Sequence, residues 1–104
     1  MTSLIFNNLK EIQLKKIAAQ FNVVGFTAKQ YSQVIKDLES AGKEKSSGRL
    51  NHVAAQQTDG LLITDVWESE EALDKFSETL VPILKKNGVT PAQPTLLPLL
   101  NIIA

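Results

Sequence analysis

Hydrophobic and polar residues recur along the chain with two different periods. Residues 15–24 (KKIAAQFNVV) alternate in a way that predicts a strand. The runs 49–57 and 61–68 are rich in apolar residues and flank Asp59-Gly60, a dipeptide that favours a hairpin with a type I′ turn. The last apolar run, 95–104, predicts a final strand. Pro98 within it has no N–H to donate, so this strand should lie at a sheet edge or be broken there.

The first stretch with helical periodicity begins after residue 26. Thr27 followed by Gln30 matches a capping box, and the helix should extend to about Ser40 before Gly42 ends it. Apolar side chains at spacings of three and four define its buried face. These residues are Tyr31, Val34, Ile35 and Leu38.

The second helical stretch follows Ser69, which is placed to cap it. The helix should end at Asn87-Gly88, and Pro82 should kink or split it after about Thr79. Its apolar face again has spacings of three and four. The residues are Leu73, Phe76, Leu80 and Leu84.

The predicted order of elements is β-α-β-β-α-β, which is the ferredoxin-like α+β arrangement: a four-stranded antiparallel sheet with both helices on one face. The strands are mostly apolar on both faces, so the uncovered face needs a partner, and a second copy of the chain in a homodimer is the simplest one. We expect one domain over residues 15–104, preceded by an N-terminal extension over residues 1–14.

Composition narrows the classes of function. The chain has 104 residues and a formal net charge of zero, which argues against a nucleic-acid or anionic-membrane partner. It contains no cysteine and one histidine, which excludes disulfides, thiolate catalysis and a multi-histidine metal site. No secretory signal is evident, and no apolar run approaches the roughly 18 residues of a membrane span. We therefore expect a soluble cytoplasmic protein.

The hairpin brings chemically useful side chains together. With Asp59-Gly60 as the loop, His52 would lie opposite Trp67, and Asp65 would lie diagonal to His52 on the same face. A three-residue loop would instead pair His52 with Val66 and turn Trp67 to the other face.

Each of these side chains has a functional and a structural interpretation. Asp65 could hold the tautomer of His52 and strengthen it as a base, and Trp67 could form a stacking wall for an aromatic ligand. Tyr31 is a candidate proton donor, and Asn22 a weaker candidate of the same kind. Alternatively, His52 and Asp65 are hydrogen-bonded structural residues, Trp67 closes the core, and Tyr31 is a core residue whose hydroxyl reaches the surface.

The segments GFTAKQY, LNHVAAQQTDGLLITDVWESEEALDKF and LLPLLNII resemble the dimeric α+β barrel superfamily. More narrowly, they resemble its antibiotic-biosynthesis-monooxygenase-like branch, over residues 15–104. The resemblance implies a cavity between sheet and helices in each subunit. Some members of the superfamily oxidise aromatic polyketides with molecular oxygen and use neither metal nor organic cofactor, others degrade haem, and many have no known activity.

The chain departs from the haem-degrading members. Asn22 and Trp67 match their first-strand Asn and third-strand Trp, but the second helix has Lys85 near the position of their histidine. In the last strand, Leu100 precedes Asn101 where members of the uncharacterised branch often carry a histidine. The resemblance therefore implies oxidation of a small aromatic or quinone-like molecule without cofactor. We expect His52 and Asp65 to be catalytic and Trp67, Tyr31 and Asn22 to bind the substrate. A non-catalytic binding module and a purely structural homodimer are the alternatives.

Overall fold

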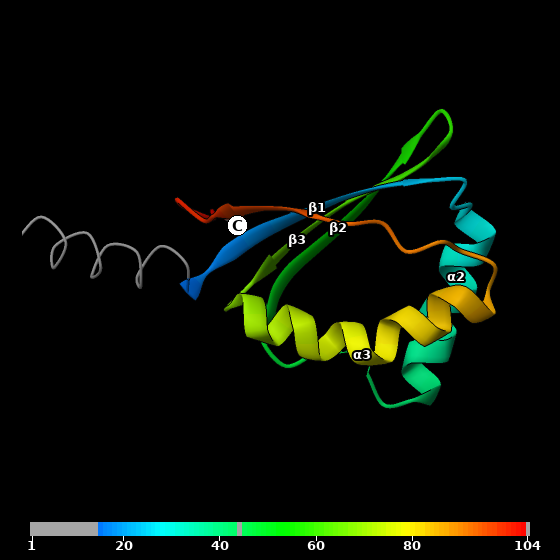
Figure 1. Ribbon diagram of the computed structural model, residues 1–104, viewed down its shortest axis with the longest axis horizontal. Helices are drawn as coiled ribbons and strands as arrows, with labels where there is room; N and C mark the ends of the chain where they lie inside the picture. Colours follow the sequence, from blue (N-terminus) through cyan, green and yellow to red (C-terminus); the bar gives the residue numbers. More distant parts are fainter. Residues whose placement is uncertain (1–14, 44, 104) are drawn as a thin grey trace, which may run out of the picture.

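The computed structural model describes residues 15–43 and 45–103, so the predicted extension over residues 1–14 lies outside the described part. The elements are β1 (Ile17–Val24), α2 (Ala28–Ser40), β2 (Arg49–Gln57), β3 (Gly60–Trp67), α3 (Glu70–Lys86) and β4 (Thr95–Pro98). This is the predicted β-α-β-β-α-β order. All the strands form one layer, and the helices lie together beneath it (Figure 1).

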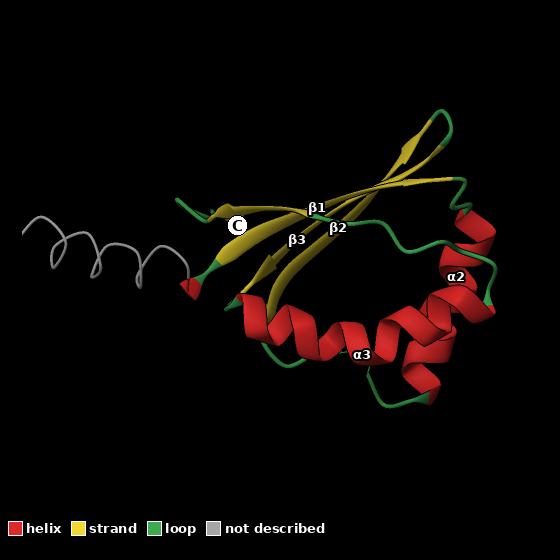
Figure 2. Ribbon diagram, viewed as in Figure 1, coloured by secondary structure: helices red, strands yellow, loops and turns green. Residues whose placement is uncertain are grey.

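The sheet has the strand order β2-β3-β1-β4, and every neighbouring pair is antiparallel. Both helices cover the same face, as Figure 2 shows with helices in red and strands in yellow. A hydrophobic core lies between the layers. Alternate residues of the strands and one face of each helix contribute its side chains. Its most buried members include Ile17, Ala19, Val34, Leu38, Trp67 and Phe76.

Both predicted helix starts are confirmed by their capping hydrogen bonds. The Thr27 hydroxyl accepts from the Gln30 backbone N–H at 3.1 Å, and the Gln30 side chain accepts from the Thr27 backbone N–H at 2.9 Å. Ser69 accepts from the Ala72 backbone N–H at 3.1 Å. These bonds satisfy donors that the first helical turn leaves without a partner. Local sequence chemistry therefore fixes where each helix begins.

Two prolines lie within predicted elements, and they have different effects. Pro82 does not split α3, which stays helical from Glu70 to Lys86 and bends along its length (Figure 1). Leu80 and Leu84 on either side pack against the core, and this burial outweighs the missing hydrogen bond. β4 is an edge strand as predicted, but it ends at Pro98 rather than at residue 104. One more backbone hydrogen bond follows Pro98, from the Leu99 N–H to the Lys16 carbonyl at 3.0 Å, and the pairing ends where β1 itself begins, at Ile17.

The hairpin register differs by two residues from the predicted one. Gln57 lies opposite Gly60, so the loop is Thr58-Asp59, and His52 lies directly opposite Asp65. A type I′ turn needs positive φ at both loop residues, yet no non-glycine residue of the described chain has positive φ. Gly60 instead allows two strands to approach closely, because a Cβ there would lie 2.1 Å from the Val23 carbonyl oxygen. A shift of two preserves the face on which each side chain lies.

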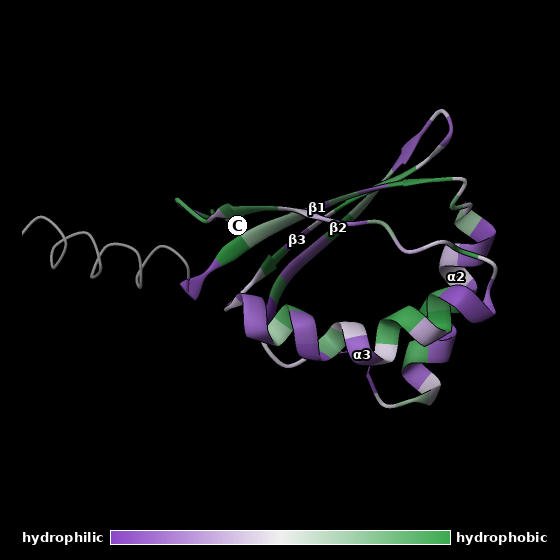
Figure 3. Cartoon of the chain, in the orientation of Figure 1, coloured by the Kyte–Doolittle hydropathy of each residue, from purple (hydrophilic) through white to green (hydrophobic). Residues whose placement is uncertain are grey.

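The sheet face opposite the helices is partly apolar and uncovered within the described chain. Val53 and Leu97 are each about half exposed on this face, at 52% and 54%. Hydrophilic residues concentrate at the tip of the β2–β3 hairpin, whereas the segment that follows β4 is hydrophobic (Figure 3). Within the described residues, none of the helices has the length and apolar character needed to cross a membrane.

Candidate functional site

A cavity of about 360 Å³ lies between the sheet and the helices. Most of its wall is apolar and comes from elements that are distant in the sequence. Representative residues are Phe21, Val23 and Ile63 from the sheet and Val34, Leu80 and Leu84 from the helices. Residues 91–94, which connect α3 to β4, line it as well. The volume falls within the range of small-molecule sites, and the mostly apolar wall suits an apolar ligand.

A chain of hydrogen bonds crosses the wall of this cavity from α2 to β3. The Tyr31 hydroxyl lies 2.6 Å from Nε2 of His52, and Nδ1 of His52 lies 2.5 Å from Oδ1 of Asp65. A carboxylate only accepts hydrogen bonds, so Nδ1 of His52 carries the hydrogen. In the neutral ring Nε2 is then the acceptor, and the Tyr31 hydroxyl donates a hydrogen bond to it. We call this arrangement the Tyr31–His52–Asp65 relay.

Asp65 is buried, with 5% of its surface exposed, and its carboxylate needs partners there. Its second oxygen, Oδ2, accepts a long hydrogen bond of 3.4 Å from Nε1 of Trp67. Trp67 is completely buried and packs against Phe76, with ring centroids 5.4 Å apart. The carboxylate therefore contacts a fully buried indole on one side and the imidazole of His52 on the other.

The electrostatic environment keeps Tyr31 protonated at neutral pH. Burial raises the pKa of its hydroxyl above the ordinary value of 10.0. The positive charge of Arg49 lowers this pKa and the negative charge of Asp65 raises it, and the net shift is upward. A phenol that retains its proton can pass that proton to His52 and take another from a ligand.

Three of the five predicted site residues come together at the cavity. Tyr31, His52 and Asp65 all line it. Trp67 shares the predicted face but lies behind Asp65 and is not part of the cavity wall, so it cannot serve as the stacking surface expected from the sequence. Asn22 projects from the opposite face of the sheet, where its side chain accepts from the Gln57 amide at 2.8 Å. Its position does not fit a ligand-binding role in this cavity.

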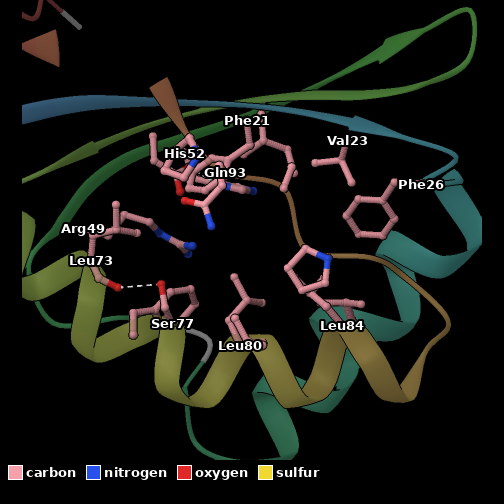
Figure 4. A pocket seen from close by; sticks show the side chains of 18 of the residues that line it. Phe21, Val23, Phe26, Arg49, His52, Leu73, Ser77, Leu80, Leu84 and Gln93 are labelled. Carbon is pink, nitrogen blue, oxygen red and sulfur yellow. Dashed lines mark hydrogen bonds and ion pairs between the residues drawn. The ribbon is translucent and has the colours of Figure 1, made fainter. Parts of the chain in front are cut away.

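Further polar residues at the cavity were not recognised from the sequence, and Arg49 and Gln93 are two of them. Arg49 and Gln93 both extend toward the open space in Figure 4. Gln93 lies in the turn-rich connector TPAQP, where the sequence gives no indication of side-chain direction. Arg49 is separated from His52 by three positions, which in a regular strand would place the two on opposite faces.

A β-bulge accounts for the position of Arg49. Arg49 lies opposite Trp67 and Asn51 lies opposite Val66, so Leu50 is an extra residue in β2. The extra residue reverses the alternation and turns Arg49 to the same face as His52. Nothing in the local sequence marks this bulge.

The described residues contain no cluster of three or more His, Asp or Glu side chains that would hold a metal ion. At the cavity, hydrogen bonds join the polar side chains of Tyr31, His52 and Asp65, and the rest of the wall is mostly apolar.

No family model matches the chain, and no curated protein is detectably similar to it in sequence. Solved structures with the same architecture do exist. One is a monooxygenase of Streptomyces coelicolor in complex with nanaomycin D, with a TM-score of 0.55, 19% identity, and coverage of 92% of this chain and 96% of that one. Another is SnoaB, a cofactor-independent oxygenase from Streptomyces nogalater, with a TM-score of 0.55, 13% identity, and coverage of 85% and 94%.

A candidate antibiotic biosynthesis monooxygenase from Chloroflexus aurantiacus gives a TM-score of 0.54 at 16% identity, with coverage of 86% of this chain and 95% of that one. The chain has the fold of the antibiotic-biosynthesis-monooxygenase-like proteins. This confirms the predicted fold class and the resemblance to that group. At these identities the likeness establishes the fold, whereas activity has to be argued from the site itself.

Proposed function

We propose that the protein is a cofactor-independent oxygenase that acts on a small planar phenol or quinone-like molecule. The observation that carries this proposal is the Tyr31–His52–Asp65 relay in the wall of an apolar cavity. The monooxygenases among its structural neighbours favour the same reading.

The relay supplies the base that such a reaction requires. As Tyr31 takes a proton from the bound molecule, its own proton passes to Nε2 of His52. The resulting imidazolium lies between the Tyr31 oxygen and the Asp65 carboxylate, which stabilises its charge. The apolar wall excludes water from the reactive anion and so protects it from reprotonation. Asp65 fixes the ring orientation, and Trp67 positions Asp65.

The anion of the bound aromatic molecule can then donate electrons to O₂ without a cofactor. In the overall change, an activated ring CH₂ and one O₂ become a ring carbonyl and one H₂O. The carbon loses four electrons, and O₂ gains them, one oxygen atom entering the carbonyl and the other leaving as water. Both hydrogens of the CH₂ leave in that water, and the relay returns to its starting protonation state. No further oxidant or reductant is needed for this balance.

Oxygen uptake with a panel of hydroxylated anthrones and naphthols tests the proposal. We expect uptake that saturates with one class of compound and is lost in His52→Ala, while that variant still binds the compound. Lys75→Ala is the matched control, because Lys75 is exposed on α3 and outside the cavity wall, and it should retain full activity. Binding without uptake would instead indicate a non-catalytic carrier. Full activity in His52→Ala would exclude the relay as the base.

We also propose that the chain forms a homodimer through the sheet face opposite the helices. The half-exposed Val53 and Leu97 support this, since an apolar sheet face in water favours a partner. Leu100 and Ile103 just beyond β4 are also exposed and add apolar surface. Light scattering at micromolar concentration should give twice the chain mass of 11.4 kDa, and Val53→Lys with Leu97→Lys should give the monomer mass. A monomeric wild type under these conditions would exclude the dimer.

A further inference from the structure

The bulge in β2 places a positive charge at the cavity that the proton relay does not use. Arg49 would face the other side of the sheet without the extra residue Leu50, and Leu50 itself is 44% exposed. Bulges recur beside functional sites, where they redirect a side chain. The irregularity in this strand has one clear effect, which is to bring Arg49 to the same side of the sheet as His52.

Aromatic packing holds the Arg49 guanidinium in place. Its central carbon lies 5.5 Å from the centroid of the Phe76 ring, and Phe76 in turn packs on the buried Trp67. This is cation–π geometry, in which the aromatic ring stabilises the face of the guanidinium. The N–H groups along the edge of the guanidinium can still donate hydrogen bonds. Figure 4 shows the guanidinium extending from β2 into the open space, on the side where His52 lies.

The charges around this position come from every neighbouring element. His52 on β2, Asp65 on β3 and Tyr31 on α2 form the relay. Glu70 and Asp74 at the beginning of α3 also line the cavity, but both are exposed, so water screens their charges. The positive charge of Arg49 acts on groups in the cavity wall, since it lowers the pKa of the Tyr31 hydroxyl. Arg49 is the only residue with a fixed positive charge in the described cavity wall.

We propose that Arg49 binds the oxyanion of the ligand, and that it thereby selects planar phenols and enols that ionise within the cavity. The aromatic rings of such a ligand would lie along the apolar wall, and its ionised oxygen would lie against the guanidinium. The ligand O–H proton leaves through the relay or to water, and the guanidinium stabilises the charge that remains. This inference rests on the proposed function for its ligand class, but it concerns ionisation of the bound molecule and not its reaction with oxygen.

Spectrophotometric titration of a bound dye tests Arg49 directly. Alizarin, a planar dihydroxyanthraquinone, changes colour when it ionises, and its bound ionisation midpoint can be read under anaerobic conditions. An opposite charge at contact distance lowers a pKa by roughly one to three units. We therefore expect bound alizarin to be about tenfold or more stronger as an acid in the wild type than in Arg49→Gln. Arg49→Lys should keep much of the effect. Asp74→Asn should shift ionisation the opposite way by a smaller factor.

The outcomes separate this inference from the proposed function. An unchanged midpoint in Arg49→Gln, or no saturable binding of alizarin to the wild type, would overturn the role of Arg49 even if oxygen uptake is observed. An Arg49-dependent midpoint without any oxygen uptake would uphold the role of Arg49 and exclude the oxygenase. Thermal melts of the variants verify folding, and Arg49→Lys keeps a positive charge and an aliphatic stem beside Phe76 if Arg49→Gln does not fold.

Discussion

Tyr31→Phe is the sharpest single change, because it removes only the oxygen that links α2 to His52. The hydroxyl and Nε2 of His52 are 2.6 Å apart, and the remaining ring keeps its tilted contact with Phe26 at 5.9 Å. The His52 side chain is 23% exposed, so water entering the cavity can replace the lost donor. We therefore expect a stability loss at the low end of roughly 0.5–1.5 kcal/mol for a hydrogen bond.

The effect of Tyr31→Phe on catalysis should be much larger than its effect on folding. A positioned proton-transfer group contributes roughly 10²- to 10⁴-fold to rate. We expect kcat/KM for oxygen uptake to fall within that range, while the dissociation constant of the substrate changes little. Steady-state uptake together with a binding titration separates the two effects. If kcat/KM of Tyr31→Phe stays within about twofold of wild type, Tyr31 does not transfer the proton, and His52 takes it directly from the ligand.

Four further predictions follow from individual contacts. Tyr31 is the only tyrosine, so near-ultraviolet titration of phenolate reports its ionisation alone. We expect a titration midpoint above 10.0, and a still higher midpoint in Arg49→Gln. A midpoint at or below 10.0 would contradict the burial of the Tyr31 hydroxyl. His52 is the only histidine, so nitrogen NMR reports its imidazole ring alone. The wild type should carry the ring hydrogen on Nδ1, and Asp65→Asn should change the tautomer population. Identical spectra would mean that Asp65 does not orient the ring. Hydrogen bonds from Asn87 and Gln33, with Lys86 nearby, lower the pKa of Asp37 below 3.8. The stability that Asp37 contributes is therefore present above that pH and lost as the pH falls through the lowered value, so the melting temperatures of wild type and Asp37→Asn should differ at pH 6 and converge in strong acid. Gly60→Ala should destabilise the fold by roughly 1–3 kcal/mol, because its Cβ would lie 2.1 Å from the Val23 carbonyl oxygen. Chemical denaturation measures this loss.

Sequence patterns predicted the architecture because local and global signals agree in this chain. The capping residues Thr27 and Ser69, the apolar faces of both helices and the edge position of the Pro98 strand were all correctly predicted. The error in the hairpin arose from Gly60. A glycine after Asp59 is the usual sign of a tight turn, but here it permits contact between β3 and β1, which is a tertiary requirement that the local sequence does not reveal.

The candidate site was only partly predictable. Strand alternation was sufficient to bring His52 and Asp65 together, because a register error of two leaves the faces unchanged. The depth of Trp67 in the core and the redirection of Arg49 by a bulge depend on three-dimensional packing. The far-face position of Asn22 follows from the regular alternation of β1. Parity along a strand cannot anticipate a bulge, so Arg49 would have been assigned to the wrong face from the sequence alone.

The most direct measurement is isotope labelling under ¹⁸O₂ with protein freed of metal by a chelator. If the relay deprotonates a planar phenol that then reacts with oxygen unaided, mass spectrometry should find one ¹⁸O atom in the product carbonyl, formed by the wild type and not by His52→Ala. A product that carries oxygen from water, or labelled product formed equally by both proteins, would contradict oxygenation at the Tyr31–His52–Asp65 relay.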